Sequence, residues 1–308
     1  MKGAIKYFVI WLFVTVAVMV MFYIIGFIVM GIAGVSIDDP EKAVMNPWLF
    51  SGALLAADVV LLLLFWKRRY TRNWIKYGFT YGEGFSSGKL ALCCVLGAIG
   101  CFYLSVMAQE YLPLPVDEEI GEWLGMLLKN PVGILSACLI GPLAEEAIFR
   151  GAIERRLLET KWNPWFAIVI SSLFFAAAHG NFQQGVTALI MGCFMGWVYY
   201  RTRSIWPCFL IHAVNNTTAV IMAYATPETM DDTLGLSLSM DIMLIVLGVA
   251  FIYLAAKGIG KMTANRTRIA EPVDVEQPWP LNDESLAANA PVANQDAATP
   301  PDFNPQDS

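Results

Sequence analysis

Three ionisable residues, Glu145, Glu146 and Arg150, interrupt a stretch of sequence that is otherwise apolar. Glu146 and Arg150 are four residues apart, so on a helix they share one face and can form a charge-assisted hydrogen bond. Glu145 projects about 100° away from Glu146 and is left without that partner. An ionisable side chain in a membrane span costs about 2.5 to 3.5 kcal/mol on insertion scales, so an unpaired carboxylate there is a candidate functional group.

Both histidines of the chain, His179 and His212, also fall in apolar segments. Phe175 precedes His179 by four residues, so its ring is expected to cover one side of that imidazole. Asn216 follows His212 by four residues, which sets an imidazole and an amide side by side on one helical face. Such a pair suits a polarised carbonyl or a developing oxyanion.

Together these residues are the parts of a hydrolytic site. A carboxylate held away from bulk water is an effective proton acceptor, so Glu145 can activate a water molecule. Two histidines and an asparagine can hold that water and stabilise a tetrahedral intermediate. Taken singly, each residue also has a structural explanation, such as a histidine bonded to a carbonyl or a Glu–Arg pair that joins helices.

In chain order, Glu145-Glu146-xxx-Arg150, Phe175-xxx-His179 and His212-xxx-Asn216 resemble the three motifs of the CPBP (CAAX protease and bacteriocin-processing, or Abi) family. That family includes the type II CAAX prenyl endopeptidases, and the match covers roughly residues 141–216. The resemblance implies an intramembrane endopeptidase with a core of transmembrane helices. It also implies the roles: Glu145 activates the water, His179 is its partner on that water, His212 and Asn216 form the oxyanion site, and Glu146, Arg150 and Phe175 are supporting residues.

The motifs leave metal dependence open. Glu145, His179 and His212 are also a reasonable zinc set, so a divalent metal such as zinc is one alternative. The type II prenyl endopeptidases are instead described as metal-free glutamate peptidases. The six cysteines all fall in apolar segments without Cys-x-x-Cys spacing, so a disulfide framework or cysteine-bound zinc is not expected.

Helices that cross a bilayer must position these residues. Hydrophobic residues make up 57% of the chain and charged residues only 15%, which favours a membrane as the solvent. The first apolar run, 7–34, is too long for a cleavable signal segment and is expected to be retained. Hydropathy predicts eight spans, at 7–34, 48–66, 90–108, 131–150, 164–179, 185–200, 205–224 and 242–257.

Loop charge supports this count. Lys and Arg collect at alternate boundaries, within 2–6, 67–76, 155–161, 201–203 and 257–268, whereas acids collect within 38–41, 117–122 and 228–232. Cytoplasmic loops carry the excess of basic residues. The sequence therefore predicts an all-α polytopic membrane bundle with about eight transmembrane helices, both termini cytoplasmic, in a bacterial plasma membrane.

Four parts are expected along the chain: N-terminal transmembrane helices in 1–128, a catalytic core in 129–224, the last span with its basic flank in 225–269, and a tail in 270–308. The tail is rich in Pro, Ala, Asn, Asp and Gln, which predicts a disordered cytoplasmic segment. It is either simply solvated or used to bind a protein partner.

The expected partners are the lipid bilayer and a membrane-associated protein or peptide substrate. The net charge of −6 gives little guidance on partners, and nucleic acid is not expected. One rival function is a proton-coupled transporter in which Glu145 and the histidines relay protons. No repeated half or pair of broken helices supports it. The other rival is a non-catalytic immunity or assembly protein, which the intact motif set disfavours.

Overall fold

The computed structural model describes residues 2–32, 46–67, 79–80, 84–112, 114–115, 118–160, 163–225 and 237–268. The chain divides into two compact units, Met1–Glu271 and Pro272–Ser308, and every described residue belongs to the first. The predicted tail therefore lies outside the described residues. So do the loop clusters at 38–41, 68–76 and 228–232, and Asp117 of the cluster at 117–122, on which much of the predicted topology rests.

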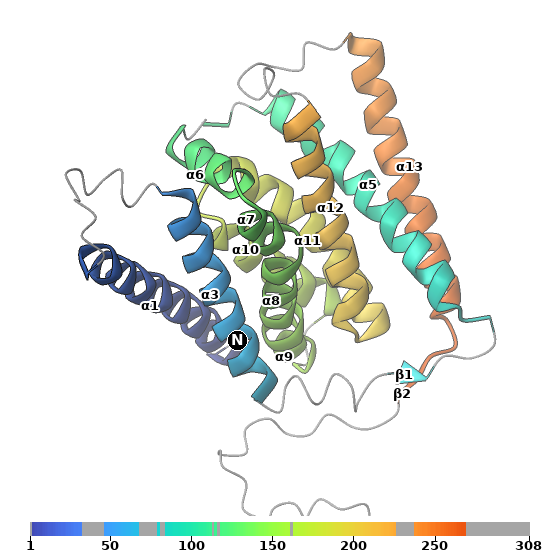
Figure 1. Ribbon diagram of the computed structural model, residues 1–308. Helices are drawn as coiled ribbons and strands as arrows, with labels where there is room; N and C mark the ends of the chain where they lie inside the picture. The colour runs from blue at the N-terminus through green and yellow to red at the C-terminus, as the bar shows by residue number, and fades with distance from the viewer. Residues whose placement is uncertain are drawn as a thin grey trace, which may run out of the picture. The chain divides into compact units, whose positions relative to one another are not determined.

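The all-α expectation is confirmed for the described residues (Figure 1). The long helices are α1 (Lys2–Ile32), α3 (Pro47–Lys67), α5 (Ser87–Tyr111), α11 (Phe182–Thr202), α12 (Ile205–Ala225) and α13 (Leu238–Met262). Two shorter helices are α6 (Glu118–Leu128) and α10 (Pro164–Ala178). Two-residue strands, β1 (Phe79–Thr80) and β2 (Thr267–Arg268), pair antiparallel.

The fourth span is one long helix interrupted by π turns. It consists of α7 (Pro131–Leu135), the π helix η1 (Ser136–Ile140), α8 (Gly141–Ile148), the π helix η2 (Phe149–Glu154) and α9 (Arg155–Leu158). It runs for 28 residues, Pro131–Leu158, so the predicted end at residue 150 was wrong. The hydropathy signal stopped early because Arg150 and Glu154 are charged, yet both are fully buried among protein groups. With the longer helix, Glu145 lies about 20 Å from Leu158 and His179 about 22 Å from Pro164, so the two residues have similar depths if both of these ends face the cytoplasm as predicted.

Six helices among the described residues are long and apolar enough to cross a membrane, namely α1, α3, α5, the fourth span, α12 and α13. α10 has 15 residues, which is about 22 Å of helix and shorter than a ~30 Å hydrocarbon core. α11 has the length but begins with the polar pair Gln183 and Gln184. Helices stand at all eight predicted positions, and the count of eight crossings stays a prediction.

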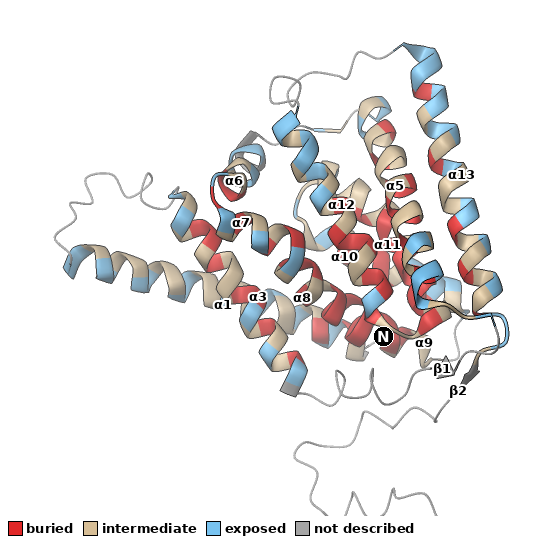
Figure 2. Ribbon diagram, turned by 45° about the vertical axis from the view of Figure 1, so that its right-hand side comes forward, coloured by how far each residue is buried: buried red, intermediate tan, exposed pale blue. Residues whose placement is uncertain are grey.

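The fourth span is central to the helical unit. In the most apolar stretch of the fourth span, 56% of the residues are buried, compared with 6% in α1 and 17% in α13. Buried residues accordingly concentrate in α8, α10, α11 and α12, whereas α1 and α13 are mostly intermediate or exposed (Figure 2). The fourth span therefore provides a site shielded by protein rather than one facing lipid.

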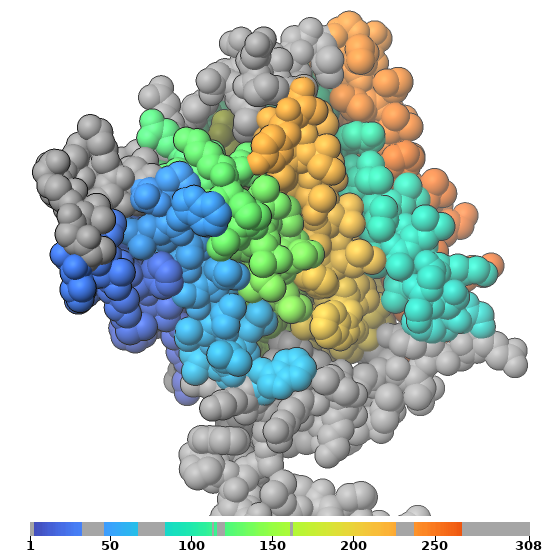
Figure 3. All heavy atoms as spheres, in the orientation of Figure 1, coloured from blue at the N-terminus to red at the C-terminus, as the bar shows by residue number. Residues whose placement is uncertain are grey.

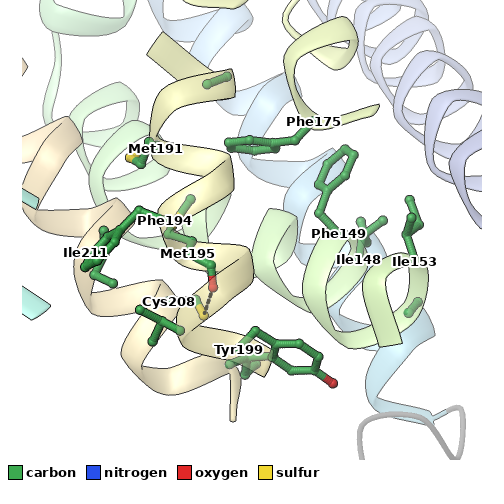
Figure 4. Close-up of a cluster of buried hydrophobic side chains, with 14 of the residues drawn as sticks. Ile148, Phe149, Ile153, Phe175, Met191, Phe194, Met195, Tyr199, Cys208 and Ile211 are labelled. Atoms are coloured by element: carbon green, nitrogen blue, oxygen red, sulfur yellow. Dashed lines mark hydrogen bonds between the residues drawn. The ribbon is translucent and has the colours of Figure 1, made fainter. Parts of the chain in front are cut away.

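Buried hydrophobic side chains join η2, α10, α11 and α12 (Figure 4). Phe149 packs edge-on against Phe175 with ring centroids 5.1 Å apart. On the side of α11, Met195 and Tyr199 are fully buried, and the Cys208 thiol of α12 donates to the Met195 carbonyl oxygen at 3.3 Å. These contacts hold α10 against the fourth span and α12 against α11.

Two further neighbours of the fourth span matter for the site. On the face in Figure 3, α3, the α7–α8 segment and α12 lie side by side, and both α3 and α12 contact α8.

The helices α5 and α13 pair closely. A Cβ atom at Gly100 would lie only 2.7 Å from the Gly248 carbonyl oxygen. Small residues that let two backbones approach are typical of helix pairs in membranes.

Candidate active site

Arg150 is the centre of a buried polar network in η2. Its Nη1 donates to Glu146 Oε1 at 3.0 Å, which confirms the pair that the four-residue spacing predicts. Its Nη2 donates to the Gly192 carbonyl oxygen of α11 at 3.2 Å, and its guanidinium carbon lies 4.5 Å from the centroid of the Phe175 ring. Arg150 Nε also lies 3.9 Å from Glu154 Oε2. Arg150, Glu146 and Glu154 are fully buried, so the arginine compensates charge where water is excluded.

His212 joins this network from α12. Its Nδ1 lies 3.0 Å from Glu146 Oε1, the oxygen that Arg150 also contacts. Because a carboxylate paired with arginine accepts hydrogen bonds, Nδ1 carries the hydrogen and donates. The bond fixes the imidazole so that Nε2 faces Glu145 Oε2 at 3.8 Å.

The two adjacent acids have different environments. The side chain of Glu145 is 28% exposed, whereas that of Glu146 is completely buried. Glu146 is held by Arg150 and His212, and Glu145 Oε2 has no hydrogen-bond partner among the described residues. The predicted pairing of Glu146 is confirmed, and Glu145 is left without a hydrogen bond at Oε2, although it lies 3.8 Å from His212.

His179 lies at the C-terminal end of α10. Its Nδ1 is 2.9 Å from the Phe175 carbonyl oxygen, and since a carbonyl only accepts, Nδ1 donates and Nε2 of the neutral ring keeps its lone pair. The Phe175 ring packs at 90° against His179 with centroids 5.0 Å apart, as predicted, and at 84° against His212 with centroids 5.5 Å apart. Phe175 thus connects the two imidazoles. Among the described residues, no hydrogen bond or ion pair joins His179 to Glu145.

Asn216 lies one turn beyond His212, and its amide bridges to the fourth span. Its Nδ2 donates to the Ala137 carbonyl oxygen in η1 at 2.9 Å. In η1 the Gly141 N–H bonds the Ser136 carbonyl five residues back, and the next bond of that pattern would need an N–H from Pro142, which has none. Asn216 supplies the missing donor, and the second hydrogen of its amide remains for a ligand.

The predicted zinc set of Glu145, His179 and His212 is not gathered into one cluster among the described residues, and metal dependence stays a prediction. In the part of the chain that the structure describes, no group of three or more His, Cys, Asp or Glu side chains is placed to hold a metal ion. Glu145 and His212 approach each other, whereas His179 contacts the backbone and ring of Phe175. All six cysteines are free thiols.

Three contacts of the site were not predicted from the sequence. They are the bond from Arg150 to Gly192, the bond from His212 to Glu146, and the bond from Asn216 to Ala137. Each joins residues at least 42 positions apart. The missing N–H of Pro142 is the one local signal that marks an unpaired carbonyl in this segment.

Known proteins resemble the region that contains the site. The family model described as type II CAAX prenyl endopeptidase Rce1-like matches residues 127–218. The membrane peptidase YdiL of Bacillus subtilis (strain 168) is 28% identical over 194 residues, which cover 60% of this chain and 75% of YdiL. The membrane-embedded CAAX protease MroQ of Staphylococcus aureus (strain USA300) is 31% identical over 130 residues, which cover 41% of this chain and 53% of MroQ. No solved structure shows a significant match.

The matched segment contains the paired acids, both histidines and the asparagine, and the fold embeds them among helices that can cross a membrane. Both relatives are bacterial, and their names describe a membrane peptidase and a membrane-embedded CAAX protease. Over residues 127–218 the chain resembles the type II CAAX prenyl endopeptidases, as its three motifs predict, and it is a multi-pass intramembrane protease of a bacterial membrane.

Proposed function

We propose that this protease hydrolyses a peptide bond of a membrane-associated protein or peptide, with Glu145 as the general base. The observation that carries the proposal is the position of Glu145 Oε2, which faces His212 Nε2 at 3.8 Å without a hydrogen-bond partner among the described residues. The neighbouring acid, Glu146, is occupied by Arg150 and by His212 Nδ1. A water molecule that contacts both Glu145 and His212 is therefore in place to lose a proton to the carboxylate.

The reaction needs two proton transfers. Glu145 takes a proton from the water as the water oxygen attacks the peptide carbonyl carbon and the carbonyl oxygen becomes an oxyanion. The protonated Glu145 then gives that proton to the leaving nitrogen as the C–N bond breaks. The carboxylate is regenerated, and the products are a carboxylic acid and an amine.

His212 and Asn216 are the proposed oxyanion donors. His212 donates from Nδ1 to Glu146, and when Nε2 also carries a proton it donates to the oxyanion, with the Glu146 carboxylate compensating the added charge. The second amide hydrogen of Asn216 is the other donor. His179 remains the proposed partner of Glu145 on the water, because its Nε2 lone pair can accept a hydrogen bond.

Quantitative N-terminal proteomics of membranes tests the role of Glu145. Wild-type cells are compared with cells carrying Glu145→Gln, Glu145→Ala or the control Glu159→Gln, which loses ion pairs to Arg155 and Arg156 on the same span. We expect specific cleaved N-termini to fall about a hundredfold in both Glu145 variants, with uncut precursors accumulating, and to persist in the control. Unchanged cleavage in Glu145→Gln, with normal amounts of the protein in the membrane, would contradict the proposed role of Glu145.

The substrate class is tested with synthetic peptides. Because MroQ is named a CAAX protease and the matching family model describes prenyl endopeptidases, we propose a prenylated C-terminal peptide as a substrate. Purified protein in lipid nanodiscs is incubated with a farnesylated CAAX peptide and with the same peptide lacking the farnesyl group. Cleavage of the farnesylated peptide alone supports this class, and equal cleavage of both contradicts it.

A further inference from the structure

We propose that Asp58, on α3, is a positioning residue for Glu145 that acts by holding the π helix η1. The proposal rests on the proposed role of Glu145. Asp58 lies outside residues 127–218, the segment that matches the family model, and belongs to none of the three motifs.

Asp58 reaches both ends of one π turn. The hydroxyl of Ser136 donates to Asp58 Oδ2 at 2.8 Å, with Ser136 fully buried and Asp58 only 8% exposed. The same carboxylate oxygen lies 3.3 Å from the position that a Cβ on Gly141 would take, and the Ser136 carbonyl oxygen lies 2.9 Å from it. Only a residue without a side chain fits at 141, so Asp58 sits against the start and the end of the turn from Ser136 to Gly141.

A second helix holds the next residue. Ala137 accepts the hydrogen bond from Asn216 on α12, while Ser136 is bound to α3. Consecutive residues of η1 are thus tied to the two helices that flank the fourth span in Figure 3. A π turn is uncommon, and in η1 the Ala137 carbonyl lacks a helical donor, which Asn216 replaces.

The turn sets the direction of Glu145. A π turn contains one residue more than an α turn, so relaxing η1 to α geometry would rotate the residues after it by about 100° relative to α7. Glu145 follows Gly141 by four residues and shares its face of α8. Loss of the bond between Asp58 and Ser136 would therefore change, one turn after Gly141, the direction of the carboxylate that faces His212.

We propose that Asp58 holds η1 through its hydrogen bond to Ser136 and not through its charge. Asp58→Asn keeps a side-chain oxygen that accepts from Ser136, whereas Asp58→Leu removes it. Ser136→Ala removes the donor and is a small change that leaves the helix sequence otherwise intact. These variants separate loss of the bond from loss of the charge, and the double variant Asp58→Leu/Ser136→Ala should be no worse than either single one, because both delete the same bond.

Cross-linking tests the position of residue 145 without any need for proteolysis. In the full chain with all six native cysteines replaced by alanine, Glu145→Cys and His212→Cys are introduced and treated in membranes with a short bifunctional methanethiosulfonate. We expect the cross-linked fraction, measured by mass spectrometry, to be unchanged by Asp58→Asn and to fall severalfold with Asp58→Leu or Ser136→Ala. The control pair is Gln109→Cys with Thr187→Cys, whose native side chains are 2.7 Å apart and far from η1 in sequence, and its cross-linking should not change.

The second readout is cleavage of the substrate found by the proteomics or peptide experiments above, measured in protein that keeps its native cysteines. A misdirected Glu145 should lower kcat by about a hundredfold in Ser136→Ala with KM little changed. Ser172→Ala, which removes a buried hydroxyl bonded within its own helix at 2.8 Å, should retain kcat. Unchanged cross-linking in both Asp58→Leu and Ser136→Ala overturns the positioning role, and equal loss in Asp58→Asn and Asp58→Leu overturns the hydrogen bond as its means. Reduced cross-linking with full cleavage supports the positioning role and contradicts Glu145 as the base.

Discussion

Arg150 carries one positive charge between two buried carboxylates. Glu146 is held at 3.0 Å and Glu154 lies 3.9 Å away, and all three side chains are fully buried. Charges removed from water are costly unless paired, and removal of one partner leaves the other buried and uncompensated. The stability of the fourth span therefore depends on this cation more than on any exposed ion pair.

We predict that Arg150→Ala destabilises the protein by about 3 to 5 kcal/mol, because buried Glu146 loses the cation that it contacts at 3.0 Å. Thermal unfolding of purified protein in detergent measures the effect. Arg156→Ala, whose ion pair with Glu159 lies near the span's end with both side chains partly exposed, should change stability by about 0 to 1 kcal/mol. Equal Tm values for wild type and Arg150→Ala would contradict the prediction.

Local spacing predicted part of the site at this scale. The Glu146–Arg150 pair and the Phe175–His179 contact both follow from four-residue spacing on a helix. The bond between His212 and Glu146 spans 66 positions and depends on how α12 packs against α8, which no local pattern encodes. For the same reason the sequence did not predict that the Phe175 ring contacts both imidazoles.

At the scale of the element, the π helix η1 depends on Pro142 and Asn216 together. Pro142 has no backbone N–H, and the Asn216 side chain donates to the Ala137 carbonyl oxygen instead. The sequence predicted a helix here and its start at residue 131 but not the π turns, and hydropathy placed the end of the span at residue 150 rather than at Leu158. Hydropathy records average polarity, so it cannot distinguish charged residues that are paired inside the protein from charged residues at a membrane surface.

We predict that Asn216→Leu destabilises the protein by about 1 to 3 kcal/mol, because the Ala137 carbonyl loses its donor. Adding Pro142→Ala restores an N–H within the helix and should recover part of that loss. Thermal unfolding of the single and double variants measures the coupling, with Thr218→Val, which loses only a hydroxyl bonded to its own helix, as the control. If Pro142→Ala recovers nothing in the Asn216→Leu background, the account of η1 is wrong.

At the scale of the molecule, α10 and α11 decide whether the chain crosses the membrane six or eight times. If both cross the membrane, their connection faces outward and the start of α12 faces the cytoplasm. Phe182 at the start of α11 and Trp206 at the start of α12 are 67% and 55% exposed, so cysteines there can be reached by reagents.

In intact cells carrying a version without native cysteines, we predict that Phe182→Cys reacts with a membrane-impermeant maleimide. Trp206→Cys should react only after the cells are permeabilised. Labelling is measured by the mass shift on a gel. Protection of Phe182→Cys in intact cells, with labelling after permeabilisation, would mean that α10 does not cross and that the bundle has fewer than eight crossings.

The two histidines of this protein both touch one phenyl ring, with centroids 5.0 and 5.5 Å from that of Phe175. Selective isotope labelling of histidine therefore gives an NMR spectrum whose every imidazole signal comes from the site. Ring currents from Phe175 act on both imidazoles, so a change in the packing of α10 against α12 displaces the two sets of resonances together. The sequence economy of this chain thus supplies a built-in spectroscopic reporter of how its catalytic helices are arranged.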